Sequence, residues 1–148
     1  MRLDIFILSP LATVLNASAI PRDISFANDS LVKAEDESYD CQGSIMCATV
    51  HVQACDIAVN SKLIRDDEPN YGSIGSGTPH RGACHGIGSD FGCAILIEGH
   101  PGCVRSGNDM WWDYQEIRHS GCHHCGHKYW RDGCATTIDY EPECDRIQ

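Results

Sequence analysis

The sequence predicts a small, disulfide-rich α+β domain: a two-layer sandwich with two helices on one face of an antiparallel sheet. Three observations lead to this fold class. All ten cysteines lie between Cys41 and Cys144, and an even cysteine count in an oxidising compartment predicts disulfides. Two segments have the apolar spacing of helices, and short apolar runs beside them are typical of strands. The resulting order of strand, helix, strand, helix and hairpin is typical of such a sandwich.

The first residues have the features of a secretory signal peptide. Arg2 supplies a positive charge, an apolar run extends from Ile5 to Leu15, and Ala17-Ser18-Ala19 fits the small-x-small cleavage rule. We therefore expect residues 1–19 to be removed and the product to be secreted and extracellular. The apolar run is shorter than the ~20 residues that span a bilayer, and no later segment approaches that length, so we expect no membrane insertion.

Residues 20–40 are predicted to be an acidic, disordered leader, and residues 41–148 to be the folded domain. The leader has no cysteine and carries six acidic against two basic residues, which leaves too little apolar content to bury. The domain carries 8 Lys/Arg and 14 Asp/Glu, a net charge near −6. This charge disfavours nucleic acid as a partner. We expect a monomer with no cofactor.

The first helix is predicted from about Val52 to Ile64, where apolar residues approximate helical spacing. Pro69 and the Gly/Ser-rich segment 71–77 end this element. The stretch up to Gly82 is predicted to be a long exposed loop.

The second helix has clearer boundaries. Asn108 is predicted to cap its start, and Gly121 lies where a left-handed C-terminal cap belongs. Trp111 and Trp112 are predicted to widen its buried face. Apolar residues recur along it at i, i+4 and i+7: Met110, Tyr114 and Ile117.

Three strands are predicted around this helix. Cys93–Ile97 is a short apolar run that ends at Glu98-Gly99 and is typical of a central strand. Lys128–Trp130 and Cys134–Tyr140 are predicted to be two further strands, because the Asp132-Gly133 pair between them is a typical hairpin turn.

Four blocks then occur in a definite order along the domain. They are the C-x-G-S-x-x-C segment Cys41–Cys47, the apolar strand Gly92–Leu96, the C-x-x-C segment Ser120–Gly126, and Thr137–Tyr140 with Cys144 close behind. This ordered set resembles the fungal killer toxin four family, named for a smut-fungus viral toxin. The resemblance implies an antiparallel sheet with two helices on one face, in agreement with the fold predicted from the residues.

The resemblance also implies three disulfides. The first two cysteines would bridge to the C-x-x-C pair, as Cys41–Cys122 and Cys47–Cys125, and Cys84–Cys144 is the next pair carried over. Four cysteines remain, for which we expect Cys55–Cys103 between helix ends and Cys93–Cys134 between adjacent strands. No free thiol would then be left.

Killer toxins of this kind inhibit the growth of competing fungi, and some members act on plant cells. The resemblance implies a secreted, non-enzymatic effector that binds a membrane protein or another cell-surface target on a second organism and blocks calcium channels through a cation on an exposed loop. The loop before Cys84 offers Arg81 for this role, and Lys62 and Arg65 are alternative target-binding residues. A different interpretation is a cell-wall-binding or antimicrobial structural protein on the same scaffold, without channel activity.

A zinc site was weighed for the C-x-x-C segment. Cys122 and Cys125 have metal-ligand spacing, but such a site needs free thiolates, which the secreted context and the implied pairing both oppose. We therefore expect no metal there. If the surrounding histidines stay exposed, their protonation between about pH 5 and 7 predicts activity confined to acidic medium. These histidines are His119, His123, His124 and His127.

The strongest enzyme interpretation is a small secreted ribonuclease. Its chemistry needs an acid, a base and a cation around a phosphate, and Glu116, Arg118 and His119 lie close together in the sequence. On a helix, however, Glu116 and His119 share a face while Arg118 points elsewhere. The acidic charge also opposes a polyanionic substrate. We therefore expect a polar helix face and no enzyme.

Overall fold

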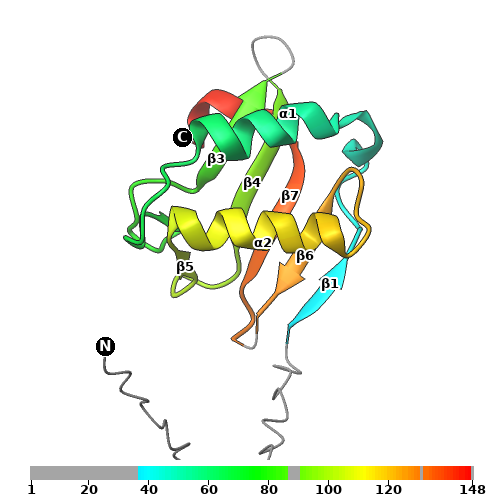
Figure 1. Cartoon of the computed structure of the whole chain (residues 1–148). Coiled ribbons are helices and arrows are strands. Elements are labelled where there is room, and N and C mark those ends of the chain that lie inside the picture. The colour runs from blue at the N-terminus through cyan, green and yellow to red at the C-terminus, as the bar shows by residue number, and fades with distance from the viewer. Residues whose placement is uncertain (1–36, 87–90, 131, 148) are drawn as a thin grey trace, which may run out of the picture. The chain divides into compact units, whose positions relative to one another are not determined.

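The computed structural model describes residues 37–147 except 87–90, 131 and the side chain of Asp145, and it confirms the predicted fold class (Figure 1). The chain divides into two units, Met1–Lys33 and Ala34–Gln148, and every described residue lies in the second. The predicted signal peptide and most of the predicted leader lie outside the described residues.

One layer is a five-stranded antiparallel sheet with the strand order β1-β6-β7-β4-β3. Both helices lie across the same face of this sheet (Figure 1). A separate two-stranded sheet pairs β2 with β5. The strands are β1 (Ser38–Asp40), β2 (Tyr71–Gly72), β3 (Gly82–Gly86), β4 (Gly92–Glu98), β5 (Val104–Arg105), β6 (Gly126–Tyr129) and β7 (Ala135–Glu141).

The helical layer contains α1 (Val52–Ile57), which continues through the wider turns of η2 (Ala58–Lys62), and α2 (Gly107–His119). In η2 the amide of Leu63 donates to the carbonyl of Ala58, five residues back, at 3.1 Å. Two short turns, η1 (Cys47–Thr49) and η3 (Cys144–Arg146), complete the elements. The predicted helices are thus present, the first of them ending two residues early.

The start of α2 differs from the prediction. Ser106, and not Asn108, caps it, with Oγ accepting a hydrogen bond from the amide of Asp109 at 3.0 Å. Asn108 lies within the first turn, where its side chain donates to Asp67 at 2.7 Å. At the other end Gly121 has a φ of 102°, so the predicted left-handed cap is confirmed.

The core lies between the helices and the sheet. Met110, Tyr114 and Ile117 of α2 are buried against Ile95 and Ile138 of the central strands β4 and β7, as the helical spacing predicts.

The expectation that both tryptophans widen this buried face is wrong for Trp112, which is 60 % exposed. Trp112 follows Met110 by two residues and therefore points to the opposite side of the helix. Trp111 is partly buried and packs against the core.

Two strands fall where a leader and a loop are predicted. Ser38–Asp40, the last residues of the predicted disordered leader, form β1 and pair with β6, with Tyr39 opposite Lys128. The acidic residue of this strand, Asp40, accepts hydrogen bonds from His127 and Tyr129, which composition alone does not reveal. Tyr71–Gly72, at the start of the predicted exposed loop, is buried and forms β2, which pairs with β5. Gly82–Gly86 forms β3, an edge strand on β4 that was not predicted.

All ten cysteines are paired. Three pairings confirm those that the resemblance implies: Cys41–Cys122, Cys47–Cys125 and Cys84–Cys144. The expected Cys55–Cys103 and Cys93–Cys134 are wrong, because the structure joins Cys55 to Cys93 and Cys103 to Cys134. Cys55 is on the buried side of α1, which packs on β4, the strand that contains Cys93. Cys103 instead lies beside Cys134, which directly precedes β7.

Candidate functional site

The two cysteine motifs form a structural staple. The C-x-G-S-x-x-C segment is tied to the C-x-x-C segment at the end of α2 by Cys41–Cys122 and Cys47–Cys125. Asp139 of β7 also holds it, accepting hydrogen bonds from the amide of Ser44 at 2.6 Å and from its hydroxyl at 2.9 Å. These motifs therefore fix the chain geometry and leave no thiolate for chemistry.

The four neighbouring histidines have separate surroundings. His127 Nδ1 lies 2.7 Å from a carboxylate oxygen of Asp40, to which it can only donate, and His124 Nδ1 lies 2.8 Å from the carbonyl oxygen of Val50. His119 and His123 are exposed. The premise that all four stay free on the surface is wrong for His127, which is partly buried and paired.

Two groups of potential metal ligands converge within the described part of the chain, with ligand atoms within 4.8 Å of one another: His100 with Cys103 and Cys134, and Cys47 and Cys125 with Asp139. In both groups the sulfurs form a disulfide. Neither group contains a histidine next to the C-x-x-C segment, so the geometry offers no support for zinc there.

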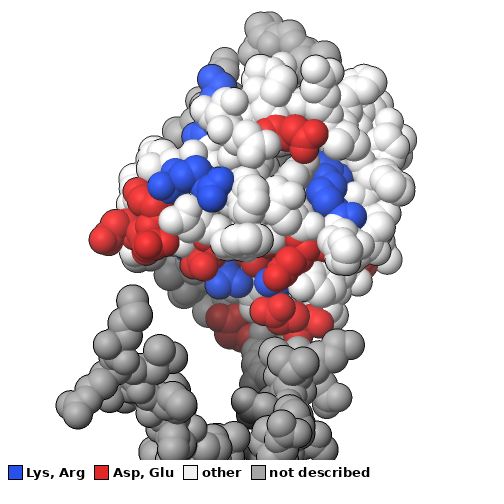
Figure 2. Space-filling view, viewed as in Figure 1, with Lys and Arg blue, Asp and Glu red and all other residues white. Residues whose placement is uncertain are grey.

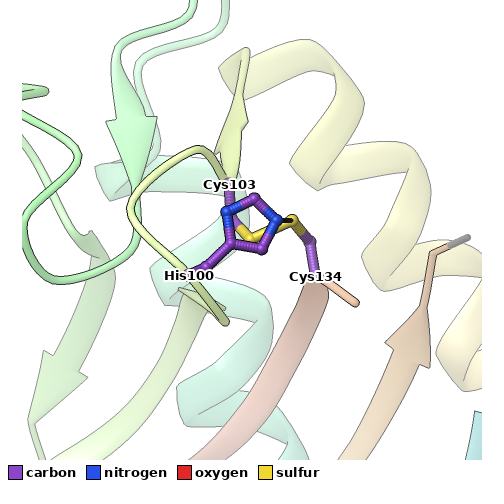
Figure 3. Close-up of side chains that lie close together, drawn as sticks. All are labelled: His100, Cys103 and Cys134. Atoms are coloured by element: carbon purple, nitrogen blue, oxygen red, sulfur yellow. Dashed lines mark hydrogen bonds between the residues drawn. A yellow bond between two sulfur atoms is a disulfide. The ribbon is translucent and has the colours of Figure 1, made fainter. Parts of the chain in front are cut away.

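The imidazole of His100 lies against the Cys103–Cys134 disulfide (Figure 3), with Nε2 3.7 Å from Sγ of Cys134. Its Nδ1 accepts from the amide of Gly102 at 3.0 Å, so Nε2 carries the proton that faces the carbonyl of Asp132 at 3.2 Å. Both ring nitrogens are thus hydrogen-bonded to the backbone, one to Gly102 and one to Asp132. Both sulfurs are in a disulfide, so these three side chains offer no thiolate to a metal.

The residues of the ribonuclease interpretation do not combine into a site. Glu116 pairs with Lys128. Arg118 Nη1 donates to the carbonyls of Cys122 at 3.0 Å and His124 at 2.9 Å, closing the end of α2. His119 is exposed. Glu116 and Arg118 are therefore engaged with different partners, and His119 joins neither of them.

A charge cluster around the buried side chains of Lys128 and Asp113, between β6 and α2, was not predicted from the sequence. Lys128 is only 5 % exposed, and its ammonium group contacts Glu116 and lies 2.9 Å from Asp113 and 3.3 Å from Glu37. Asp113 also accepts a hydrogen bond from Thr136 at 2.5 Å. The signal in the sequence was the i, i+3 spacing of Asp113 and Glu116, which puts two carboxylates on one helix face.

The pKa values in this cluster follow from its geometry. Burial lowers the pKa of Lys128, but its hydrogen bonds to Glu116 and Asp113 and their negative charges outweigh burial and raise it above the ordinary value. Burial, with the nearby Glu116, raises the pKa of Tyr39 to about 12 against the opposing charge of Lys128. Lys128 therefore keeps its charge and Tyr39 its proton at neutral pH, as in a structural network.

The three cations proposed for target binding lie in different surroundings. The guanidinium of Arg65 lies 4.5 Å from the ring centre of Trp111 and donates to Asn108 at 3.0 Å. Lys62 is exposed at the end of η2. Arg81 lies in the segment between β2 and β3. On the helical face, acidic and basic side chains alternate without one large basic area (Figure 2).

Arg81 differs from the other two because it is partly buried and lines cavities. One cavity of about 210 Å³ lies among residues 72–81, Arg146 and Ile147. A second, of about 130 Å³, lies between Arg81, Glu98 and their neighbours. The Nε atom of Arg81 is buried without a hydrogen-bond partner, and its side chain forms no ion pair with any described residue. Nε of Arg105, Nε and Nη2 of Arg118 and Nε1 of Trp130 are also buried without a hydrogen bond. The guanidinium groups of Arg105 and Arg118 nevertheless have other partners in the fold.

No described helix combines the length and apolar character needed to cross a membrane.

Comparison with known proteins gives one match. The family model described as "Meiotically up-regulated gene family" matches residues 39–144, which is nearly all of the described domain. No curated protein and no solved structure matches the chain.

Proposed function

Because the chain belongs to the meiotically up-regulated gene family, whose description states no biochemical activity, we propose a function from its fold and its charges. The protein is a secreted, non-enzymatic effector of the killer toxin four type. It inhibits the growth of competing fungi or plant cells by binding a cell-surface target, with a calcium channel as the target that the resemblance implies.

The observation that carries this proposal is Arg81. A cation important for target binding must keep its charge available, and the guanidinium of Arg81 makes no ion pair within the described residues. Arg65 is engaged with Trp111 and Asn108, and Lys62 is a fully solvated side chain of the kind that is rarely specific. Arg81 is therefore the contact residue of the proposal.

Two further observations support the toxin scaffold. The three disulfides that the killer toxin resemblance implies are present. Two of them tie the N-terminal motif to the C-x-x-C segment, and the third ties Cys144 to strand β3, which suits a small protein that must persist outside the cell.

The test is growth inhibition by the purified, oxidised protein, with and without added calcium. We expect inhibition of fungal or root growth that calcium relieves. Arg81→Ala should raise the half-inhibitory concentration at least about tenfold, the loss typical of a residue at the centre of an interface. Lys62→Ala and Arg65→Ala, which remove the same charge elsewhere, are the matched comparisons.

Equal losses in all three variants would contradict the assignment to Arg81. Capture of the protein by chitin or glucan, without calcium rescue, would favour the alternative, a cell-wall-binding protein. The exposed Trp112 (60 % exposed) is suited to stacking on a sugar ring, so Trp112→Ala should then abolish the capture.

A further inference from the structure

We propose that the cavity beside Arg81 binds a phosphate group, and that a phosphate group is the feature of the target that this protein recognises. The role of phosphate in target recognition rests on the proposed function. Phosphate binding concerns the purified protein alone, so either claim can fail without the other.

The first argument is an uncompensated charge. Arg81 is partly buried and its Nε is shielded from solvent without a hydrogen bond. Removing a charge from water is costly unless a partner replaces the lost hydration, and a guanidinium matches phosphate oxygens with two parallel donors. The other described arginines all have partners in the fold: Arg65 with Asn108, Arg105 with Asp113, Arg118 with the carbonyls of Cys122 and His124, and Arg146 with Glu143.

The charge of the lining also favours an anion. The domain is acidic, yet residues 69–86 contain no Asp or Glu, and none of the described residues that line the cavity of about 210 Å³ is acidic. Arg146 also lines this cavity, but its guanidinium is paired with Glu143 at 2.7 Å, so Arg81 is the arginine of the lining that has no ion pair. Glu98 shares the smaller cavity with Arg81, and its carboxylate accepts a hydrogen bond from Thr137 at 2.7 Å. An anion therefore belongs in the larger cavity.

The third argument is the backbone of the lining. Gly75 and Gly77 have φ values of 86° and 81°, and neither amide donates a hydrogen bond within the described part of the chain. The amides between and after them are used, since Ser76 donates to the carbonyl of Ser73 at 3.1 Å and Thr78 to the hydroxyl of Ser76 at 3.3 Å. Left-handed glycines with free amides are a recurring way to form concave anion sites.

The arrangement of donors favours phosphate over a carboxylate. Arg81, Arg146 and the glycine amides belong to different segments around one cavity. A tetrahedral phosphate presents oxygens in several directions, whereas a carboxylate presents two in one plane. The phosphate could be free in solution or the headgroup of a lipid, and the chemistry of recognition is the same in both.

The experiment is a titration of the full secreted protein with sodium phosphate at constant ionic strength, followed by NMR. We expect the amides of Gly75 and Gly77 and the Nε–H of Arg81 to shift together with one dissociation constant. Arg81→Gln should raise that constant at least about tenfold. Arg81→Lys, which keeps the charge but loses the two-donor geometry, should give an intermediate value and serves if the glutamine variant misfolds. Lys62→Ala, outside the cavity, should change it by less than about twofold.

Equal shifts with chloride or acetate, or an unchanged constant in both Arg81 variants, would overturn the proposal. Phosphatidylcholine vesicles with and without phosphatidic acid then identify the source. Capture only by the phosphatidic acid vesicles, competed by phosphate, assigns a lipid headgroup, whereas phosphate binding without capture assigns a soluble phosphate. If phosphate fails to bind but Arg81-dependent growth inhibition persists, the phosphate assignment fails and the proposed function stands.

Discussion

The two edges of the five-stranded sheet carry their charges in opposite ways. At the β1–β6 edge, Lys128 is enclosed by Asp113, Glu116 and Glu37. At the β3 edge, Arg81 borders two cavities, and its side chain has no hydrogen-bond or ion-pair partner among the described residues. The charge of Lys128 is balanced by carboxylates of the same fold. The charge of Arg81 has no such partner, so its counter-charge must come from outside the fold.

The difference also appears in the backbone. Near β1 the chain is tied down by two disulfides and by strand pairing. Before β3 the chain forms a glycine-rich turn with two left-handed residues, Gly75 and Gly77. Binding residues are commonly found on loops that a rigid scaffold positions. Because of this contrast, we propose the unpaired charge of Arg81, and not the densest cluster of charges, as the contact with the target.

The largest effect is expected from Lys128→Met. The substitution leaves buried Asp113 and its neighbours without their ammonium partner, and breaking a buried pair in this way costs about 3–5 kcal/mol of unfolding free energy. Chemical denaturation of the oxidised protein measures it. Lys62→Met is the matched control, because an exposed side chain without partners should change stability by less than about 0.5 kcal/mol. A loss below about 1 kcal/mol at Lys128 would mean that the cluster behaves as solvated surface pairs.

A smaller, pH-dependent effect is expected from Asp40→Asn in β1. Burial tends to raise the pKa of Asp40, but hydrogen bonds from His127, Gln42 and Tyr129 outweigh it and hold the pKa below its ordinary value. A depressed pKa contributes stability that is present above the unfolded-state pKa of about 3.9 and is lost as the pH falls through the folded value.

Wild type should therefore exceed Asp40→Asn in stability by no more than about 1 kcal/mol near neutral pH, the range of exposed pairs. The gap should close below about pH 4 in denaturation curves measured at several pH values. A stability difference that stays constant down to pH 2 would show that the charge of Asp40 does not contribute to the stability of the fold.

Local patterns predicted much of the fold. The i, i+4, i+7 spacing of Met110, Tyr114 and Ile117 placed the core face of α2, because the period of a helix is fixed by its geometry. The cap could not be chosen in the same way. Ser106 and Asn108 are both good N-cap residues, and what decides between them is the contact of Asn108 with Asp67 from a distant loop.

Long-range features were beyond such patterns. The pairing of Cys55 with Cys93 depends on how α1 lies on β4, and four cysteines admit three pairings that spacing alone does not rank. At the candidate site, Arg81 was identifiable as a loop cation. Its lack of a partner was not, because that property depends on every side chain that the fold brings near it.

The smallest stability effect, and the sharpest test of the comparison, is expected from Arg81→Met. The substitution keeps an unbranched, flexible side chain, although a shorter one, and removes a partly buried charge that has no partner, so the unfolding free energy should stay the same or rise by up to about 1 kcal/mol. Phosphate binding and growth inhibition should nevertheless be lost. Such a trade of function against stability is typical of binding residues and not of structural ones.

Arg105→Met is the control for this prediction, because Arg105 is an arginine that has partners within the fold. Arg105 pairs with buried Asp113 at 3.4 Å and its guanidinium lies 3.7 Å from the ring centre of Trp130. Its loss should destabilise the fold in denaturation experiments, by about 1–3 kcal/mol. If Arg81→Met were destabilising to the same degree, Arg81 would hold the loop together. The proposed difference between a paired charge at the β1–β6 edge and an unpaired charge at the β3 edge would then be contradicted. If only Arg105→Met destabilises, the charge that the fold leaves without a partner is the one kept for the target.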